Sequence, residues 1–336
     1  MKTKPRVIFR VDESIQVGFG HMSRCLALAD AIARANIKVE FWSIDVRLSS
    51  RKTLEQLGAK LVDLIDDHTF LDQDWHDSIV VVDGYHFDEV FWQSLIAKSP
   101  IRTVCIDDYR SVQYWADIVV CNNTGVHPKQ FKLAQNTRLF LGEKYVLLRP
   151  EILAAASQSA RTSGRRVVMI VTGGTEQENW VAKMLSHMAH VKPGVLLWVL
   201  SGRRLREARV LYRSRQEKAH VRFFSGLNAA EMLRRYSQVR CLIAPASTVM
   251  LEAFSIGCPL VTGWIADNQR NSLDYLSRNG LVINSGDLRN VSARKLGLSY
   301  AKAVRESRPM KRKQREYIQN SKNGINEVVG AILGED

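Results

Sequence analysis

The stretch that decides the fold lies near the start of the chain, where residues 6–35 read RVIFRVDESIQVGFGHMSRCLALADAIARA. Its first six residues are mostly Val, Ile and Phe, which predicts a buried strand over Arg6 to Val11. From His21 to Ala35 the apolar residues recur three and four positions apart, which predicts an amphipathic helix. The connecting loop contains Gly18 and Gly20, which allow the backbone to approach a ligand closely.

The same alternation of apolar runs and helical spacing continues along the chain, and it is typical of a parallel sheet covered by helices. Further strands of the first half are expected at Val39 to Ser43, Ser78 to Val82, Thr103 to Ile106 and Ile118 to Cys121. The pattern restarts in the second half, at Arg166 to Val171, Gly194 to Leu200, Val221 to Phe224, Arg240 to Ala244, Pro259 to Thr262 and Leu281 to Ile283. The sequence therefore predicts an α/β protein with two Rossmann-like domains.

A small, polar stretch separates the two halves and predicts a linker over residues 152–165. The expected domains are then residues 1–151 and 166–300, and the helical segment 301–336 is expected to pack back on the first domain. Two parallel sheets joined in this way are expected to face a cleft. Since ligands of open parallel sheets bind outside the carboxyl ends of the strands, residues that follow strands are the candidates for chemistry.

Composition and charge narrow the class of protein. The chain is 46% hydrophobic and 24% charged, as in soluble proteins, and no apolar run approaches the roughly 20 residues of a membrane span. The start of the chain shows no secretion signal, so a cytoplasmic location is expected. The five cysteines are widely spaced, with no pair that suggests a zinc site or a dithiol redox centre, so buried free thiols are expected.

The 48 Lys and Arg exceed the 34 Asp and Glu, which gives a net charge of +14 and indicates an anionic partner. A nucleic acid, an acidic membrane surface and a phosphorylated small molecule all fit this charge. No nucleic-acid-binding motif is present, so no nucleic acid is expected.

His21 is the first candidate for catalysis. It lies at the start of the expected helix, beyond the carboxyl end of the first strand. The positive end of the helix dipole favours the neutral imidazole, which can accept a proton from water. A structural histidine is the alternative.

Two stretches of the second half are candidates for binding phosphate. The turn Gly173-Gly174-Thr175 follows a strand and exposes backbone N–H groups, although such a turn is also ordinary. Ser247 and Thr248 follow another strand, where Ser247 can cap a helix whose free N–H groups bind a diphosphate.

Other polar residues also follow strands. Glu252 lies one turn into the helix after Ser247 and could accept hydrogen bonds from a ribose, or it could be incidental. Asn268 and Gln269 lie beyond the next strand and are expected to face the cleft. Asp83 and the pair Asp107-Asp108 also follow strands, and they fit either metal binding and general base chemistry or loop carboxylates that hold backbone turns.

Together these motifs resemble the sugar-nucleotide hydrolases of pseudaminic acid biosynthesis, which remove UDP from UDP-2,4-diacetamido-2,4,6-trideoxy-β-L-altropyranose. The most specific motif is Arg10-x-Asp12-x-Ser14-x-x-x-Gly18-x-Gly20-His21-x-x-Arg24. Further matches are Asp83-x-Tyr85, Asp107-Asp108, Asp117-Ile118, Leu147-Leu148-Arg149-Pro-Glu151, Gly173-Gly174-Thr175, Ser247-Thr248 with Glu252, and Asn268-Gln269. This family is similar to the lipid II N-acetylglucosaminyltransferase of peptidoglycan synthesis and shares its GT-B fold.

The resemblance implies an inverting hydrolysis of a UDP-sugar without metal or cofactor. It implies that His21 is the general base and that Tyr85 and Asn268 line the sugar side of the cleft. Asp12, Gly18, Gly20 and Arg24 of the first motif are expected to bind substrate, and so are Gly173, Gly174, Thr175, Ser247, Thr248, Glu252 and Gln269 of the second domain. The chain has Asp83-Gly84-Tyr85-His86 where the family commonly has Asp-His-Tyr-Gly, and Glu176 where Asp is usual, so the hexose is left open.

The nearest alternative is a glycosyltransferase of the same fold, which passes the sugar to an acceptor instead of water. Only small-molecule partners, the UDP-sugar and water, are expected, and no membrane insertion.

Overall fold

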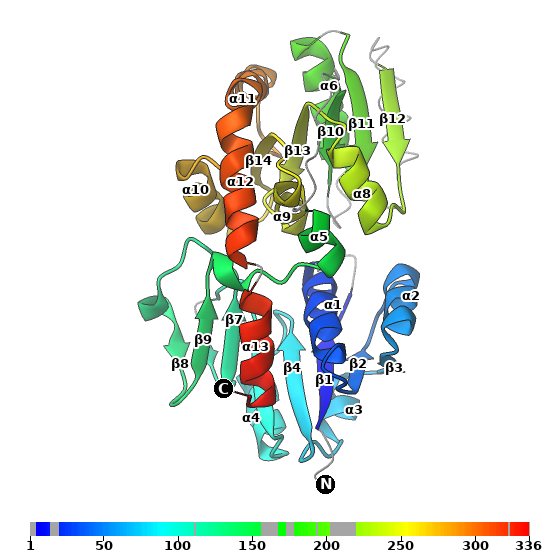
Figure 1. Ribbon diagram of the computed structural model, residues 1–336, viewed down its shortest axis with the longest axis vertical. Helices are drawn as coiled ribbons and strands as arrows, with labels where there is room; N and C mark the ends of the chain where they lie inside the picture. Colours follow the sequence, from blue (N-terminus) through cyan, green and yellow to red (C-terminus); the bar gives the residue numbers. More distant parts are fainter. Residues whose placement is uncertain are drawn as a thin grey trace. The chain divides into compact units, whose positions relative to one another are not determined.

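The computed structural model describes residues 5–13, 20–110, 112–155, 167–172, 178–192, 194–201, 220–321 and 323–335. The chain forms two compact units. The first unit comprises Met1–Arg149 and Asn320–Asp336, and the second comprises Pro150–Gln319 (Figure 1). In the described parts of the chain, no helix is both long and apolar enough to cross a membrane.

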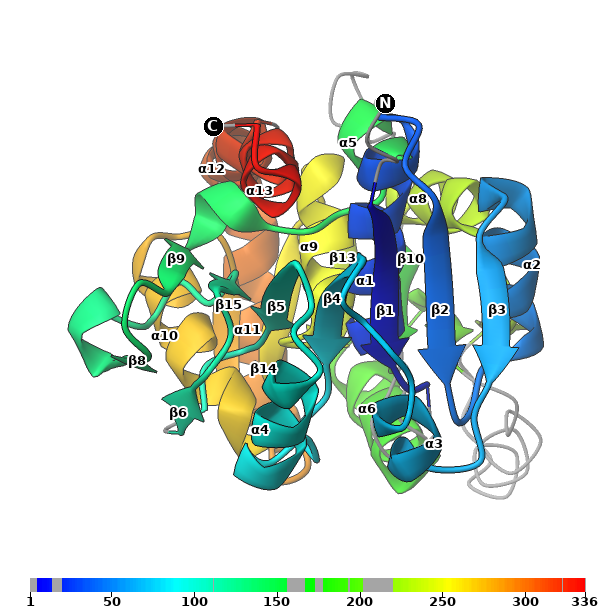
Figure 2. The ribbon, with the colours of Figure 1, turned by 90° about the horizontal axis from the view of Figure 1, so that it is seen from below.

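Among the described residues of the first unit, seven parallel strands form one sheet in the order β3-β2-β1-β4-β5-β7-β9. These strands are β1 (Arg6–Val11), β2 (Val39–Ser43), β3 (Lys60–Asp63), β4 (Ser78–Asp83), β5 (Arg102–Ile106), β7 (Ile118–Cys121) and β9 (Arg138–Leu141). The short strands β6 (Gln113–Tyr114) and β8 (Lys132–Leu133) pair separately. Figure 2 shows β1 between β2 and β4 at the centre of the sheet.

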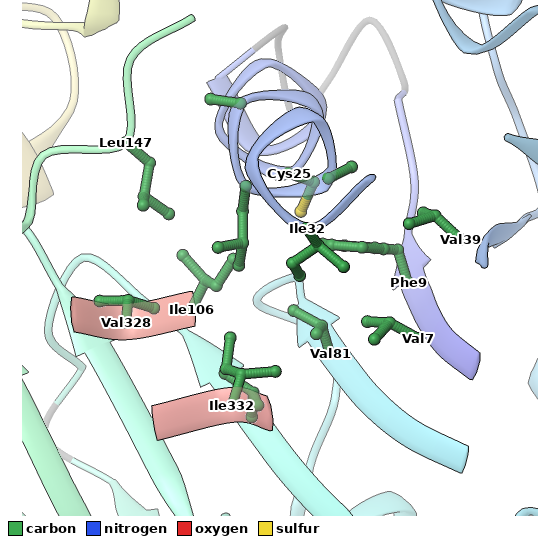
Figure 3. Packing of buried hydrophobic residues seen from close by; sticks show 14 of the residues in the cluster. Val7, Phe9, Cys25, Ile32, Val39, Val81, Ile106, Leu147, Val328 and Ile332 are labelled. Atoms are coloured by element: carbon green, nitrogen blue, oxygen red, sulfur yellow. The ribbon is translucent and has the colours of Figure 1, made fainter. Parts of the chain in front are cut away.

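Helices cover both faces of this sheet, which explains why its central strands are apolar at almost every position. The helices are α1 (Gly20–Ala33), α2 (Leu48–Leu57), α3 (Asp67–Leu71), α4 (Glu89–Ala97) and α13 (Gly324–Leu333), with the 3₁₀ turns η1 (Pro128–Gln130) and η2 (Glu143–Tyr145). On one face, α1 and α13 pack over Phe9, Val81 and Ile106 (Figure 3). On the other face, Ile8 and Val80 pack in a core with residues of α3 and α4.

Among the described residues of the second unit, six parallel strands form one sheet in the order β12-β11-β10-β13-β14-β15. The strands are β10 (Val167–Val171), β11 (Leu196–Leu200), β12 (His220–Phe224), β13 (Cys241–Pro245), β14 (Leu260–Trp264) and β15 (Ile283–Asp287). The helices are α5 (Pro150–Ala155), α6 (Glu178–Val191), α8 (Ala229–Tyr236), α9 (Thr248–Ser255), α10 (Arg270–Arg278), α11 (Ala293–Arg305) and α12 (Ser307–Ser321), with the turn η3 (Asp267–Gln269). The predicted α/β fold with two parallel-sheet domains is confirmed.

Three features differ from the sequence expectations. The strand expected at Leu281 to Ile283 is β15, which begins at Ile283 and continues through polar residues to Asp287. Strands β3 and β9 were not expected, because they are short and each begins with a charged residue. Helix α5 occupies the first residues of the expected linker, and the remainder of the linker lies outside the described residues.

Candidate active site

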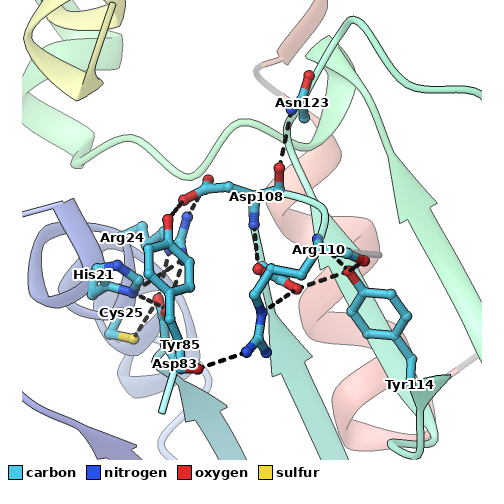
Figure 4. Close-up of polar contacts among 10 residues, drawn as sticks. His21, Arg24, Cys25, Asp83, Tyr85, Asp108, Arg110, Tyr114 and Asn123 are labelled. Carbon is cyan, nitrogen blue, oxygen red and sulfur yellow. Dashed lines mark hydrogen bonds and ion pairs between the residues drawn. The ribbon is translucent and has the colours of Figure 1, made fainter. Parts of the chain in front are cut away.

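The candidate active site lies at the carboxyl edge of the first sheet. Strand β4 ends at Asp83, the neighbouring strand β5 is followed by Asp107 and Asp108, and α1 brings His21 to the same edge in its first turn. Since parallel strands end on the same side, residues far apart in sequence meet there. Figure 4 shows the resulting group of polar side chains.

His21 and Asp83 form the centre of this group. Nδ1 of the nearly buried His21, which is 4% exposed, hydrogen-bonds Oδ1 of Asp83. Arg24, one helical turn after His21, donates from Nε to Oδ2 of Asp83 at 2.6 Å and from Nη2 to Oδ1 at 2.7 Å. Burial alone would raise the pKa of Asp83, but the charge of Arg24 and the contact with His21 bring this pKa well below its usual range.

The ionised Asp83 fixes the tautomer of His21. A carboxylate only accepts hydrogen bonds, so the proton of the neutral imidazole lies on Nδ1, and Nε2 carries the lone pair. In the described part of the chain no residue hydrogen-bonds Nε2. The arrangement has the geometry of a histidine base oriented by a buried carboxylate.

Asp108 and Tyr85 extend the network from the other side of Arg24. Nη1 of Arg24 donates to Oδ1 of Asp108 at 2.5 Å, and the hydroxyl of Tyr85 donates to Oδ2 of Asp108. Burial and the Asp108 carboxylate both raise the pKa of Tyr85, so its hydroxyl remains protonated. The Tyr85 side chain is partly exposed, and its ring stands edge-on to His21 with the centroids 4.6 Å apart.

The charges of this network are unequal. Burial raises the pKa of Asp108, but the charge of Arg24 and the hydrogen bond from Tyr85 lower it, so both carboxylates are ionised beside one arginine. Asp83 and Asp108 carry two negative charges and Arg24 one positive charge, so the network has a net charge of −1 when His21 is neutral. A proton taken up at Nε2 of His21 brings this net charge to zero. The site is therefore suited to a histidine that gains a proton during a reaction.

The neighbouring Cys25 does not supply a nucleophile. Its Sγ lies 3.5 Å from Oδ2 of Asp83, and burial together with that carboxylate raises the thiol pKa well above its usual value. The thiol therefore stays protonated.

A second group of residues holds the loop that carries Asp108. The buried Asp107 accepts hydrogen bonds from the Tyr114 hydroxyl at 2.8 Å, from Nε of Arg110 at 3.1 Å and from the backbone N–H of Asp108 at 2.7 Å. Arg110 also donates from Nη1 to the carbonyl oxygen of Tyr85 at 2.8 Å. Asp107 thus holds a backbone turn, which is one of the two alternatives that the sequence left open. Asp108 belongs instead to the network of His21.

The described residues contain no group of three or more His, Cys, Asp or Glu side chains placed to hold a metal ion. Instead, Asp83 and Asp108 are both engaged with Arg24. Sequence reasoning considered these two aspartates without assigning them to the site. The sequence does indicate them, since each directly follows a buried strand. It does not show that both carboxylates bind the same arginine.

The remaining residues of the first motif are placed differently. Asp12 accepts hydrogen bonds from the fully buried Arg10 at 2.6 and 2.9 Å and from the backbone N–H of Ile44 at 2.8 Å. Its carboxylate is therefore engaged within the protein. Gly20 is the first residue of α1, and Gly18 lies outside the described residues.

In the second unit, α9 begins directly after β13. Ser247 occupies the N-cap position, but its hydroxyl does not cap the helix, contrary to the sequence expectation. The buried Oγ of Ser247 has no hydrogen-bond partner among the described residues. Thr248 is the first residue of α9, and Glu252 lies one turn further along, buried on the same helix. The free N–H groups of such a helix start can bind an anion.

The other predicted residues of the second unit are less completely described. The side-chain oxygen of Gln269 accepts a hydrogen bond from the backbone N–H of Ile265 at 2.9 Å, so it holds the loop after β14. Asn268 lies in η3, but its side chain is outside the described set. Gly173, Gly174 and Thr175 also lie outside the described residues.

Comparison with known proteins defines the fold class. No family model matches the chain. It is 23% identical over 287 residues to an uncharacterized protein of Methanocaldococcus jannaschii, a match that covers 81% of this chain. The match covers 58% of that relative, so the chain spans little more than half of its length.

Two solved structures are similar over nearly the whole chain. A glycosyltransferase from Rickettsia africae has a TM-score of 0.69 at 10% identity, with 99% of this chain and 100% of that chain covered. The Arabidopsis thaliana protein UGT89C1, solved in complex with UDP-L-rhamnose, has a TM-score of 0.68 at 14% identity, with 99% and 100% covered. The chain has the GT-B fold of these glycosyltransferases.

Proposed function

We propose that the protein is an inverting nucleotide-sugar hydrolase, which cleaves a UDP-sugar at the anomeric C–O bond and releases UDP and the free sugar. The observation that carries this proposal is the pair of His21 and Asp83, which leaves Nε2 of a correctly oriented imidazole available as a base. The GT-B fold and the sequence resemblance support a UDP-sugar as substrate. The resemblance further favours UDP-2,4-diacetamido-2,4,6-trideoxy-β-L-altropyranose or a close relative, within pseudaminic acid biosynthesis.

In the proposed reaction, Nε2 of His21 takes a proton from water while the water oxygen attacks the anomeric carbon. The bond between that carbon and the oxygen of the β-phosphate breaks, and its electron pair leaves with UDP. Because the water attacks opposite to the leaving group, the anomeric configuration inverts. General base catalysis of this kind typically accelerates a reaction by roughly 10²- to 10⁴-fold.

Asp83 acts as the positioning residue of His21. It holds the tautomer in which Nε2 is basic, and its negative charge stabilises the imidazolium that forms. Arg24 keeps Asp83 ionised and links it to Asp108 and Tyr85. We infer that Tyr85, together with Asn268, lines the sugar side.

The second unit is proposed to bind UDP. The N–H groups at the start of α9, with the Ser247 hydroxyl and Thr248, would receive the diphosphate, and Glu252 would receive the ribose. Gly173, Gly174 and Thr175, for which the sequence predicts a turn, are proposed to donate backbone N–H groups to the same phosphates. These dipoles would stabilise the negative charge that develops on the leaving UDP.

A glycosyltransferase is the second candidate, favoured by the likeness to solved glycosyltransferases. The same Nε2 would then deprotonate an acceptor hydroxyl in place of water. The two candidates differ in whether an acceptor is needed for UDP release.

The test is incubation of the purified protein with a panel of nucleotide sugars and no acceptor, with the anomeric and UDP signals followed by proton NMR. The hydrolase proposal expects UDP and free sugar of inverted configuration from one UDP-sugar. His21→Phe is expected to abolish this turnover while UDP binding is retained. UDP release only after an acceptor is added would favour the glycosyltransferase, and turnover retained by His21→Phe would contradict the role of His21.

A further inference from the structure

A second network of charged side chains lies at the carboxyl edge of the first sheet. The guanidinium of Arg10, on β1, is fully buried and donates to the two carboxylate oxygens of Asp12 at 2.6 and 2.9 Å. It also donates from Nε and Nη2 to Oδ1 of Asp67, the first residue of α3, at 3.0 and 2.6 Å. Two carboxylates thus share one buried arginine, as they do in the network of His21.

His86 reaches this network from the loop that follows β4. Its Nε2 lies 3.4 Å from Oδ2 of Asp12 and 3.9 Å from Oδ2 of Asp67. Burial raises the pKa of Asp12, but hydrogen bonds from His86 and Arg10 outweigh this and bring the pKa well below its usual range. Since ionised carboxylates only accept hydrogen bonds, Nε2 of His86 carries a proton.

Packing also holds the ring of His86. The ring lies against that of Phe87 with the centroids 3.9 Å apart, and Phe87 is buried in the core beside α3 and α4. Gly84 leaves room for both rings, because a Cβ at this position would lie 2.6 Å from Cε2 of Phe87 and 3.0 Å from Cε1 of His86. His86 therefore has a defined orientation although its side chain is 44% exposed.

The second nitrogen of His86 is not used within the protein. In the part of the chain that the structure describes, no residue hydrogen-bonds Nδ1. Because Nε2 carries the proton, Nδ1 of the neutral ring carries the lone pair and accepts a hydrogen bond. An exposed acceptor with a fixed orientation is suited to recognise an N–H or O–H group of a ligand.

The loop after β4 joins this network to the candidate active site. Tyr85, the residue before His86, donates to Asp108, and its ring stands edge-on to His21 with the centroids 4.6 Å apart (Figure 4). Asp83 and His86 are three residues apart in the chain, so their Cα atoms are at most about 11 Å apart. A hexose that lies beside His21 can therefore carry one of its substituents to His86.

We propose that His86 is a specificity-determining residue, which accepts a hydrogen bond at Nδ1 from an N–H or O–H group of the hexose of the substrate. This inference rests on the proposed function. Asp12 and Asp67 act as positioning residues, because they hold the proton on Nε2 and orient the ring. A sugar that lacks the matching group is bound less well, since the acceptor is then covered without a partner.

The experiment measures kcat and KM of His86→Gln and His86→Asn for UDP-2,4-diacetamido-2,4,6-trideoxy-β-L-altropyranose. The Gln amide can take the place of Nε2 beside Asp12, but it leaves no acceptor at the position of Nδ1. KM should therefore rise about 10-fold with kcat nearly unchanged. The Asn amide lies nearer to the position of Nδ1, so His86→Asn should raise KM less. The dissociation constant of UDP alone, measured by titration calorimetry, should not change in either variant.

The matched control is His76→Gln. His76 is an exposed histidine whose Nδ1 lies 2.8 Å from Oδ1 of Asp74, and it precedes the amino end of β4. This variant should leave KM unchanged, and circular dichroism verifies that all three variants fold.

Three results would overturn the inference while the proposed function stands. They are an unchanged KM in His86→Gln, an equal rise of KM in His76→Gln, and an equal loss of affinity for UDP and for the UDP-sugar in His86→Gln. A different result, in which the unchanged chain turns over no nucleotide sugar, would overturn the proposed function and this inference with it.

Discussion

The two units hold their candidate functional groups in different ways. In the first unit, His21, Arg24, Asp83 and Asp108 are joined to one another by hydrogen bonds and ion pairs. In the second unit, the hydroxyl of Ser247 is buried with no hydrogen-bond partner among the described residues. The first arrangement is organised before substrate binds, as a catalytic base requires. The second leaves a polar group for a ligand to satisfy, as a binding site requires.

The same contrast is visible in two buried threonines. Thr103 of the first unit donates to the Asp117 carboxylate at 2.8 Å and accepts from the Asp117 backbone N–H at 3.0 Å. Thr262, fully buried on β14 of the second unit, has no hydrogen-bond partner for its hydroxyl within the described residues. The hydroxyl of Thr103 therefore contributes to stability, whereas that of Thr262 reduces it.

The largest effect is expected for Asp83→Asn. This change removes the carboxylate that orients His21 and leaves the buried Arg24 with one charged partner, Asp108. Activity should fall by roughly 10³- to 10⁴-fold, and the free energy of unfolding should fall by about 3 kcal/mol. Steady-state kinetics and urea unfolding measure both.

The matched control for Asp83→Asn is the same substitution at Asp63, which pairs with Arg51 on the surface. Exposed ion pairs contribute little, so this variant should keep its activity and lose less than about 1 kcal/mol. If the two variants lost similar stability, the buried network would not be the organised site described above.

A second prediction concerns the dependence of stability on pH. The pKa values of Asp83 and Asp108 are lowered in the folded chain, so their contribution is fully present above the unfolded value near 3.8. It is lost as the pH falls below that value, because the unfolded chain then binds protons that the folded chain does not. Urea unfolding from about pH 6 to about pH 3 should show this loss, and Asp83→Asn should show a smaller one. Equal slopes for both proteins would contradict the prediction.

In the second unit, Ser247→Ala should affect binding without affecting stability. Its hydroxyl makes no hydrogen bond to the described residues, so removal leaves no group unpaired within the protein. If the hydroxyl binds the diphosphate, KM for the UDP-sugar should rise about 10-fold with kcat nearly unchanged.

Ser255→Ala is the control for Ser247→Ala, since Ser255 lies at the other end of α9 and its hydroxyl donates to the Glu252 carbonyl at 2.7 Å. This variant should leave KM unchanged. A similar KM for the unchanged chain and for Ser247→Ala would remove Ser247 from the binding site.

The smallest effect is expected for Thr262→Val, which replaces an unpartnered buried hydroxyl by a methyl group of the same shape. The variant should be more stable by up to about 1 kcal/mol. The same change at Thr103 should destabilise by about 1 kcal/mol, because its hydrogen bonds to Asp117 are lost. Equal signs for the two changes in urea unfolding would contradict the contrast between the two threonines.

The sequence predicted those elements whose apolar pattern is continuous. Strand β1 and helix α1 lie where the pattern places them, because both bury apolar side chains against the same core. The edge strands β3 and β9 were missed, since strands at or near the edge of a sheet bury less and carry polar residues.

The candidate site was predicted only in part, for a related reason. His21 and Arg24 share one helical segment, so a local motif reveals both. Their carboxylate partners, Asp83 and Asp108, come from other strands, and only the sheet order β1-β4-β5 brings them together. The N-cap position of Ser247 was predicted, but the orientation of its hydroxyl depends on packing that local sequence does not encode.

The central claim is that His21, oriented by Asp83, activates water at the anomeric carbon of a UDP-sugar. The most direct measurement is turnover in water enriched in oxygen-18, with the sugar and UDP analysed by mass spectrometry. The account predicts one labelled oxygen in the free sugar, none in UDP, and no turnover by His21→Gln. Label in UDP would show that a P–O bond breaks, and turnover retained by His21→Gln would show that another group activates the water.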